Sequence, residues 1–299
     1  MTLEQLRVFV AVAQRQNMTR AAEALNLAQS AVSSAIANLE GRHGAKLFHR
    51  VGRGIELTEA GSMFLIEAQA VLARAEAAEL VLAELAGLKR GTLLVHASQT
   101  IASYWLPRHL VSFRRAHPGI EIKLAIGNTA QVADAVVNGR AGIGFVEGPV
   151  DDTFLTVFEV ARDQMVVVVG LDHPWAARKE VAPAELASTE WVLREPGSGT
   201  RSAFEESLSA IGIPLSSLNI ALELPSNEAV RAAVESGLGA TALSASAAVS
   251  GIEAGLLHLV PIALSVRSFN AVWHNERHRS KTTAALLTLV TGLSSAKIN

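Results

Sequence analysis

A short glycine-rich segment carries the clearest binding chemistry in this sequence. Residues 194–201 read Arg-Glu-Pro-Gly-Ser-Gly-Thr-Arg and open a predicted helix that runs to about Leu208. Glycines let the backbone approach a ligand closely, and the free N–H groups at the start of a helix favour an anion. The segment therefore predicts an anion site, to which Thr200 and Arg201 add side-chain donors. The alternative is an ordinary helix cap beside surface arginines.

Three predicted strands end beside further polar residues. Residues 93–97, 121–126 and 142–146 are short apolar runs, and hydroxyl or carboxylate side chains follow them. The carboxyl ends of parallel strands meet at one edge of a sheet, where ligands of α/β proteins bind. We therefore expect a ligand site that combines these strand ends with the glycine-rich segment. Its predicted residues are Ser98, Thr100, Thr129, Glu147, Ser198, Thr200 and Arg201.

The residue types in this site favour a small anion. Hydroxyls, helix N-termini and Arg201, with few carboxylates among them, predict a locally electropositive site. An inorganic oxyanion, a carboxylate or a sugar phosphate would suit it. Glu147 is the exception, since it could contact a hydroxyl or an amine, or pair with Arg201. A neutral or zwitterionic ligand therefore stays open.

The sequence lacks the usual patterns of catalytic and metal sites. Ser198 does not lie in the Gly-x-Ser-x-Gly of a nucleophile elbow, and residues 41–46 do not match a P-loop. The segment His-Asn-Glu-Arg-His at 274–278 lacks the glutamate that directly follows the first histidine in zinc-binding helices. The chain has no cysteine, which excludes thiolate chemistry. We predict no catalytic residue, no cofactor and no metal.

The region from 88 to 299 alternates strands with helices. Further strand candidates lie at 165–169, 191–193, 220–224 and 240–244, and helical stretches lie near 106–116 and 131–138. This alternation is typical of a parallel-sheet α/β fold. The region is long enough for two lobes of about a hundred residues each.

The first 58 residues differ from the rest in charge. They hold seven Arg or Lys and four Glu, a net charge of +3, and the remainder carries −5. A basic head on an acidic body is typical of a module that binds a polyanion. Thr2 and Gln5 predict a capping box for a first helix that runs to about Gln16.

Two more helices and a hairpin follow in this head. Asn17 can cap the second helix, where Ala21 and Ala22 are small enough for a close helix crossing. The third helix spans about 29–40, and residues 49–57 read as a hairpin with a basic tip between glycines. The predicted unit is a helix-turn-helix followed by a wing.

These motifs resemble the winged helix-turn-helix of LysR-type transcriptional regulators. The order of elements extends the resemblance over nearly all 299 residues. It rests on Met-Thr-Arg-Ala-Ala-Glu-Ala-Leu at 18–25, Gln-Ser-Ala-Val-Ser at 29–33 and Leu-Thr-Glu-Ala-Gly at 57–61, with Leu39, Glu40, Gly44, Leu47, Phe48 and Arg50 between them.

The resemblance implies which residues touch DNA. The start of the third helix would read base edges in the major groove, the second helix would meet phosphates, and the wing would meet phosphates or the minor groove. Ser33 could instead be a solvated serine, and Arg20 could pair with Glu23. Short side chains at 34, 37 and 38 favour readout of DNA shape. The predicted contacts are Thr19, Arg20, Gln29, Ser30, Ser33, Ser34, Arg50 and Arg53.

Residues 59–88 form one predicted long helix of Ala, Glu and Leu. Its apolar residues alternate spacings of four and three, which is typical of a coiled-coil seam. We expect it to dimerise, which would pair two DNA-reading heads, although it could instead pack on its own body. The predicted seam is Phe64, Val71, Ala75, Ala78, Leu82 and Leu85.

The resemblance also implies the organisation of the remaining chain. The family's effector domain is similar to a periplasmic solute-binding protein, with two Rossmann-like α/β lobes and a ligand between them. The chain would cross between lobes near Arg162 and Arg267. The expected domains are thus 1–58 for DNA, 59–88 as the linker helix, and 89–299 for the effector, with lobe I at 91–161 and 267–299 and lobe II at 162–266.

The sequence as a whole predicts a cytoplasmic transcriptional regulator without enzymatic activity. Its expected partners are double-stranded DNA, a small and anionic effector, and further copies of itself as a homodimer or homotetramer. RNA polymerase is a further candidate partner. No secretory or membrane-spanning segment is expected. A solute-binding or carrier protein is the alternative, although such a protein has no use for a basic winged head.

Overall fold

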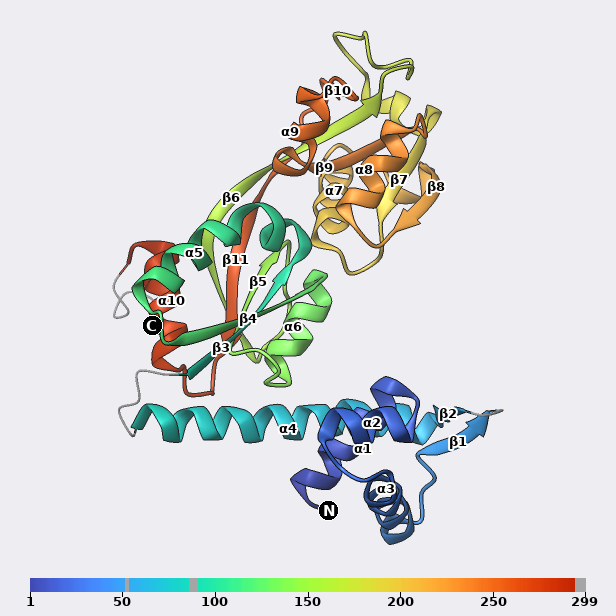
Figure 1. Cartoon of the computed structure of the whole chain (residues 1–299). Coiled ribbons are helices and arrows are strands. Elements are labelled where there is room, and N and C mark those ends of the chain that lie inside the picture. Colours follow the sequence, from blue (N-terminus) through green and yellow to red (C-terminus); the bar gives the residue numbers. More distant parts are fainter. Residues whose placement is uncertain (52–53, 86–90, 294–299) are drawn as a thin grey trace. The chain divides into compact units, whose positions relative to one another are not determined.

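Three helices open the N-terminal head in the computed structural model, which describes residues 1–51, 54–85 and 91–293. They are α1 (Leu3–Arg15), α2 (Met18–Leu25) and α3 (Gln29–His43) (Figure 1). The predicted capping box is confirmed, because the Gln5 amide donates to the Thr2 hydroxyl at 3.2 Å and the Thr2 amide donates back to Gln5 at 3.0 Å. Asn17 caps α2 by accepting the Arg20 amide.

Small and aromatic side chains bring these helices together. Ala21 and Ala22 are buried on α2, which permits the close crossing that the sequence predicted. Phe9 on α1 is completely buried, and its ring centroid lies 5.4 Å from that of Phe48 and 4.9 Å from that of Phe64. One aromatic cluster therefore joins α1 to the first strand of the hairpin and to the long helix that follows the hairpin.

The hairpin follows α3 and is attached to it by a buried carboxylate. Strand β1 (Phe48–Val51) pairs antiparallel with β2 (Gly54–Leu57). Glu40 accepts the backbone amides of Leu47 and Phe48 through Oε1 at 2.8 and 3.2 Å, and the Lys46 ammonium through Oε2 at 2.7 Å. Burial by itself raises the pKa of Glu40, but these hydrogen bonds and the Lys46 charge outweigh burial and lower it.

The start of α4 (Glu59–Leu85) holds the same segment from its other side. The Thr58 hydroxyl donates to the Lys46 carbonyl at 2.7 Å, and the Thr58 amide donates to the Leu47 carbonyl at 3.0 Å. Gly61 permits this approach, since a Cβ there would lie 2.0 Å from the Leu47 carbonyl oxygen. The base of the hairpin is thus fixed between α3 and α4.

The predicted seam of α4 divides into two parts. Phe64 packs in the core of the head, so the first turns of α4 pack on the chain's own body, as the alternative proposed. Further along, Val71 is 41% and Leu82 67% exposed. Ala78 is also exposed and Ala75 is partly buried. The side chain of Leu85 and the expected end of the helix near Leu88 lie outside the described residues.

The first α/β lobe is built on parallel strands with helices on both faces. Strand β3 (Gly91–Ser98) pairs with β4 (Ile120–Gly127) and with β5 (Ile143–Glu147). A π-helical turn at Ile101–Trp105 precedes α5 (Leu106–Ala116). One hydrophobic cluster joins α5 and α10 (Lys281–Thr291) to the sheet, and a separate cluster holds α6 (Thr129–Val137).

The second lobe repeats this plan. Its strands are β7 (Glu190–Arg194), β8 (Asn219–Leu224), β9 (Ala240–Ser244) and β10 (Leu257–Val260). One cluster contains α7 (Gly199–Ala210), and another contains α8 (Asn227–Glu235) and α9 (Ala245–Glu253). Short 3-10 turns lie at Pro183–Ser188 and Leu215–Ser217.

Two antiparallel strands connect the lobes (Figure 1). Strand β6 (Leu155–Gly170) pairs with β11 (Val266–His274) as far as Gln164 and with β9 from Met165 onward. This change of partner lies close to the expected crossings near Arg162 and Arg267. The sheet is therefore mixed rather than parallel, because an apolar run indicates that a strand is buried but not which way it points.

In the described parts of the chain, every helix is either too short or too polar to cross a bilayer.

The Glu40 contact predicts a pH-dependent stability of the head. Because the folded pKa lies below the ordinary 4.5, Glu40 stabilises the fold above that pH and loses its contribution as the pH falls toward the folded value. Glu40→Gln should cost about 1–3 kcal/mol at neutral pH, the range for hydrogen bonds to a charged group, and less below pH 4.5.

Tryptophan fluorescence would not report unfolding of the head, because the four tryptophans all lie in the α/β region. Circular dichroism during urea unfolding would therefore measure the free energy of unfolding. Glu59→Gln, at an exposed carboxylate, serves as the control. An equal loss for Glu40→Gln at both pH values would contradict the prediction.

Candidate functional site

The residues predicted to touch DNA lie on three elements of the head. Thr19 and Arg20 occupy the first turn of α2 and are exposed. Arg50 is exposed on β1, whereas Arg53 lies outside the described residues. The remaining four lie in the first two turns of α3, where Gln29, Ser30 and Ser34 are exposed and Ser33 is partly buried.

Two of these α3 residues contact each other. The Gln29 side-chain amide donates to the Ser33 hydroxyl at 2.9 Å. Glutamine binds an adenine edge through one acceptor and one donor, and its second N–H can therefore remain on Ser33. The helix thus presents a glutamine whose orientation depends on a neighbouring serine.

The predicted ligand residues of lobe I are brought together at the ends of its strands. Ser98 ends β3, Glu147 ends β5 and Thr129 starts α6, and all three are buried. The Ser98 hydroxyl donates to the Glu147 carboxylate, and the Thr129 hydroxyl donates to the Glu147 carbonyl at 2.7 Å. Thr100, just before the π-helical turn, is completely buried.

Lobe II contributes the start of α7. Ser198 stands at the N-cap position, and Thr200 in the first turn is 1% exposed. Gly199 lies against lobe I so closely that a Cβ would approach the Glu147 carbonyl oxygen to 2.0 Å. This glycine is therefore required for the contact between the lobes.

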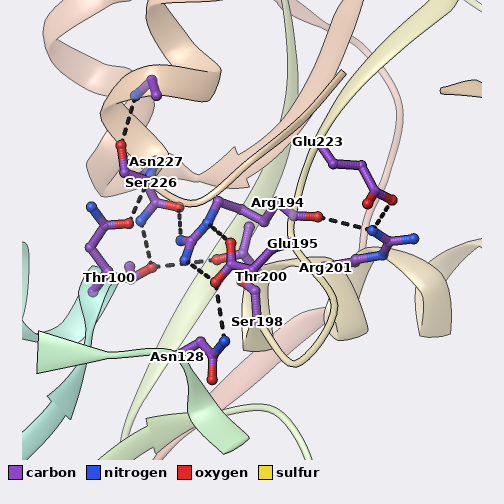
Figure 2. A network of polar contacts seen from close by, with 12 residues as sticks. Thr100, Asn128, Arg194, Glu195, Ser198, Thr200, Arg201, Glu223, Ser226 and Asn227 are labelled. Carbon is purple, nitrogen blue, oxygen red and sulfur yellow. Dashed lines mark hydrogen bonds and ion pairs between the residues drawn. The ribbon is translucent and has the colours of Figure 1, made fainter. Parts of the chain in front are cut away.

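Hydroxyls from the two lobes meet directly. Thr100 Oγ1 lies 3.4 Å from Thr200 Oγ1 and accepts the Asn227 side-chain amide at 3.0 Å (Figure 2). Asn227, at the start of α8, also donates its backbone amide to Gln99 at 2.8 Å. A ligand bound to both threonine hydroxyls would take the place of their mutual contact.

A buried arginine that the sequence analysis did not assign to the site completes this cluster. Arg267 on β11 lies directly opposite Asp163 on β6 and donates to its carboxylate through Nε at 2.8 Å. Its Nη1 reaches the Thr200 hydroxyl at 3.1 Å, and its Nη2 reaches the Thr100 hydroxyl at 3.5 Å. The signal available in the sequence was its position at a predicted lobe crossing.

A second buried arginine organises the neighbouring contacts. Arg194 donates to both carboxylate oxygens of Glu195 at 2.8 and 3.0 Å and to the side-chain Oδ1 of Asn227 at 2.8 Å (Figure 2). Glu195 also accepts the Asn128 amide of lobe I at 3.2 Å. Burial raises the pKa of Glu195, but the Arg194 hydrogen bonds and charge, helped by Asn128, lower it overall.

The guanidinium of Arg201 has other partners. It donates to Glu223, and to the Arg194 carbonyl at 3.1 Å (Figure 2). It also donates to Glu205 at 2.7 Å. Glu147 lies near Arg267 instead, with 3.8 Å between Oε1 and Nη1. In this structure the guanidinium that reaches both threonines is therefore that of Arg267.

The charges at the boundary between the two lobes differ from expectation. We expected few carboxylates, and this was wrong, since Asp163 and Glu195 join Glu147 there. Arg194 and Arg267 oppose them. The pairing of β6 with β11 brings in Asp163 and Arg267, which are distant in sequence from the predicted site residues, and strand-end motifs therefore did not reveal them. Arg194 and Glu195 stand in the glycine-rich segment itself but were not assigned to the site. Among the described residues, His, Asp and Glu form no group of three able to hold a metal ion.

Comparisons with known proteins cover both parts of the chain. Residues 3–62 match the bacterial regulatory helix-turn-helix proteins of the lysR family, and residues 86–294 match the LysR substrate binding domain. These matches confirm the resemblance and the predicted fold class, and they support a regulator rather than a carrier.

Individual proteins agree with these matches. The chain is 36% identical over 281 residues to the uncharacterized HTH-type transcriptional regulator YeiE of Escherichia coli K12, covering 93% of each chain. It has the fold of the LysR family regulator CbnR, with a TM-score of 0.73 at 23% identity and 97% and 98% coverage. The regulatory domain of Synechocystis PCC6803 CcmR, solved in complex with 2-PG, has a TM-score of 0.62 at 26% identity and covers 68% of this chain and 97% of that domain.

Proposed function

The chain belongs to the LysR family of bacterial transcriptional regulators, and from this premise we propose how its own residues bind DNA and effector. It is a DNA-binding transcriptional regulator with an effector-binding domain. On α3, Gln29 with Ser30, Ser33 and Ser34 reads base edges. The residues Thr19, Arg20, Arg50 and Arg53 bind phosphates or the minor groove.

We propose that a second copy of the chain covers the exposed part of α4. Val71, Ala78 and Leu82 lie one or two turns apart on one side of this helix and are exposed in the single chain. Exposed apolar side chains in a helical row favour helix pairing. Phe64, which packs on Phe9, supports the head instead. A dimer formed in this way would carry two reading heads.

We propose that the effector is a small acid held between the lobes. The observation that carries this is the buried Arg267 guanidinium, which reaches hydroxyls from lobe I and lobe II. The N–H groups at the start of α7 add donors beside Thr200. The CcmR domain in complex with 2-PG supports a small-molecule effector in a domain of this fold. Binding there would bias the relative position of the lobes, since it uses both.

Other roles follow from the family and the sequence. We expect no catalytic activity and no cofactor, because the sequence lacks the motifs of catalytic sites. We also propose that the protein works in the cytoplasm, where it has access to DNA, and that RNA polymerase is a partner at the promoter.

The proposed base readout can be tested by substitution in the head. Gln29→Ala should relax the preference at one base position, at a cost of roughly 1–3 kcal/mol for the lost bidentate contact. Arg50→Ala should weaken binding to all DNA sequences alike. It should also reduce the slope of the logarithm of the binding constant against the logarithm of the salt concentration by about 1. Fluorescence anisotropy on a promoter fragment and single-base variants would measure both. Arg162→Ala, an exposed arginine outside the head, is the control. Unchanged DNA binding by both head variants would contradict the roles assigned to Gln29 and Arg50.

Assembly through α4 can be tested by placing charges on its exposed apolar side. Ala78→Glu with Leu82→Glu should dissociate the oligomer, because pairing would bury like charges. Ser62→Glu with Gln69→Glu adds the same charge on the opposite side of the helix and should leave the mass unchanged. Light scattering at equal concentration would compare them. If both pairs assemble like wild type, the interface lies elsewhere.

The proposed effector site can be tested by ligand-dependent stabilisation. A thermal-shift screen of sulfate, sulfite, phosphate, sugar phosphates and small carboxylates should find a stabiliser. A ligand at 100 times its Kd contributes about 2.7 kcal/mol, or roughly 5 °C or more for a domain of this size. Thr100→Val and Arg267→Gln should each abolish the shift while DNA binding to a non-specific fragment persists.

Arg201→Gln is the matched control for Arg267→Gln. The contacts of Arg201 with Glu205 and Glu223 predict that this variant keeps the shift. Loss of the shift in Arg201→Gln and its retention in Arg267→Gln would instead assign the ligand to Arg201. Stabilisation by amines or apolar compounds alone would contradict an acidic effector.

A further inference from the structure

Glu147 places an acceptor among the donors of the effector site. Its carboxylate is only 2% exposed and accepts the Ser98 hydroxyl. The Thr129 hydroxyl holds its backbone carbonyl at 2.7 Å, and Gly199 of lobe II packs against it. The side chain is therefore fixed at the lobe seam, and an ionised carboxylate can only accept hydrogen bonds.

The nearby arginines are engaged mainly by other carboxylates. Arg267 donates to Asp163 through Nε at 2.8 Å, and a second contact from Nη2 is also 2.8 Å. Its Nη1 lies 3.8 Å from Glu147 Oε1, which is too long for a hydrogen bond. Arg194 is held by Glu195. Glu147 is thus a buried carboxyl group whose side chain accepts its hydrogen bond from the Ser98 hydroxyl.

This arrangement disfavours an effector that carries only negative charge. A plain oxyanion beside Arg267 would also stand beside Glu147, where two like charges at short range repel in a poorly solvated site. A ligand with an acid group and a neighbouring donor satisfies both sides. Its acid group accepts from Thr100, Thr200 and Arg267, and its donor binds Glu147.

We propose that Glu147 selects acids that carry a hydroxyl or an ammonium group on the carbon next to the acid group. This rests on the effector site proposed above. The short separation of Glu147 Oε1 and Arg267 Nη1 favours ligand groups on adjacent carbon atoms over the two ends of a long ligand. Ser98 acts through Glu147 as a positioning residue, since its hydroxyl orients the carboxylate.

Matched ligands that differ in one group test this selectivity. Acetate, glycolate and glycine carry hydrogen, hydroxyl and ammonium on the same carbon, and succinate, malate and aspartate form a larger series. Calorimetric titration of the full chain should give at least one donor-bearing member of a series a Kd roughly tenfold or more below that of the plain acid, as expected when a buried group gains its partner. Preference for glycine or aspartate identifies ammonium, and preference for glycolate or malate identifies hydroxyl.

The variant Glu147→Gln should reduce this ratio to about threefold or less, chiefly because the plain acids bind more tightly. Glu205→Gln removes a carboxylate from an ion pair on α7 outside the seam and should leave the ranking unchanged. The wild-type ranking is informative even where Glu147→Gln does not fold.

Two failures are distinguishable. Wild-type binding of acetate, succinate, sulfate or phosphate at least as tightly as the donor-bearing acids would overturn the role of Glu147 and leave the effector site standing. If neither series nor any compound of the anion screen binds, the proposed effector site itself fails.

Discussion

The structure of the effector domain depends on one buried ion pair. Arg267 and Asp163 face each other on β11 and β6, at the point where these strands pass from one lobe to the other. An arginine buried without a partner costs several kcal/mol, so the pair fixes the register of the two strands. The same guanidinium binds hydroxyls of both lobes, and the hydroxyl of Ser244 supports Asp163 at 2.7 Å.

The boundary between the lobes can respond to a ligand because many of its contacts are polar. Examples are the side-chain hydrogen bonds of Asn128 with Glu195 and of Thr100 with Asn227, and the hydrogen bond of the Asn227 backbone amide to Gln99. Polar contacts of this kind have a modest net free energy and can be exchanged for contacts with a ligand. A ligand that replaces some of these contacts shifts the equilibrium between relative positions of the two lobes, whereas the hydrophobic core of each lobe remains intact.

The N-terminal head is held together by an aromatic core and by hydrogen bonds at the base of the wing, rather than by a buried pair of charges. Phe9 holds its helices through an aromatic core, and Glu40 and Thr58 fix the base of the wing between α3 and α4. Of the residues predicted to touch DNA that lie in the described part of the head, all but the partly buried Ser33 are exposed, and Gln29 is oriented by its hydrogen bond to Ser33. Their function depends on the rigid placement of α3 and the wing rather than on burial.

The sequence by itself determined the local elements. Capping residues, apolar periodicity and glycines act within a few residues, and they correctly predicted α1 to α4, the wing and the strands β3, β4, β5, β7, β8 and β9. The tertiary structure alone decided the antiparallel course of β6 and β11, the packing of Phe64 in the head, and the meeting of Arg267 and Asp163 with the predicted Thr100, Thr200 and Glu147. These residues lie tens to more than a hundred positions apart, and only strand pairing and the burial of charge bring them together.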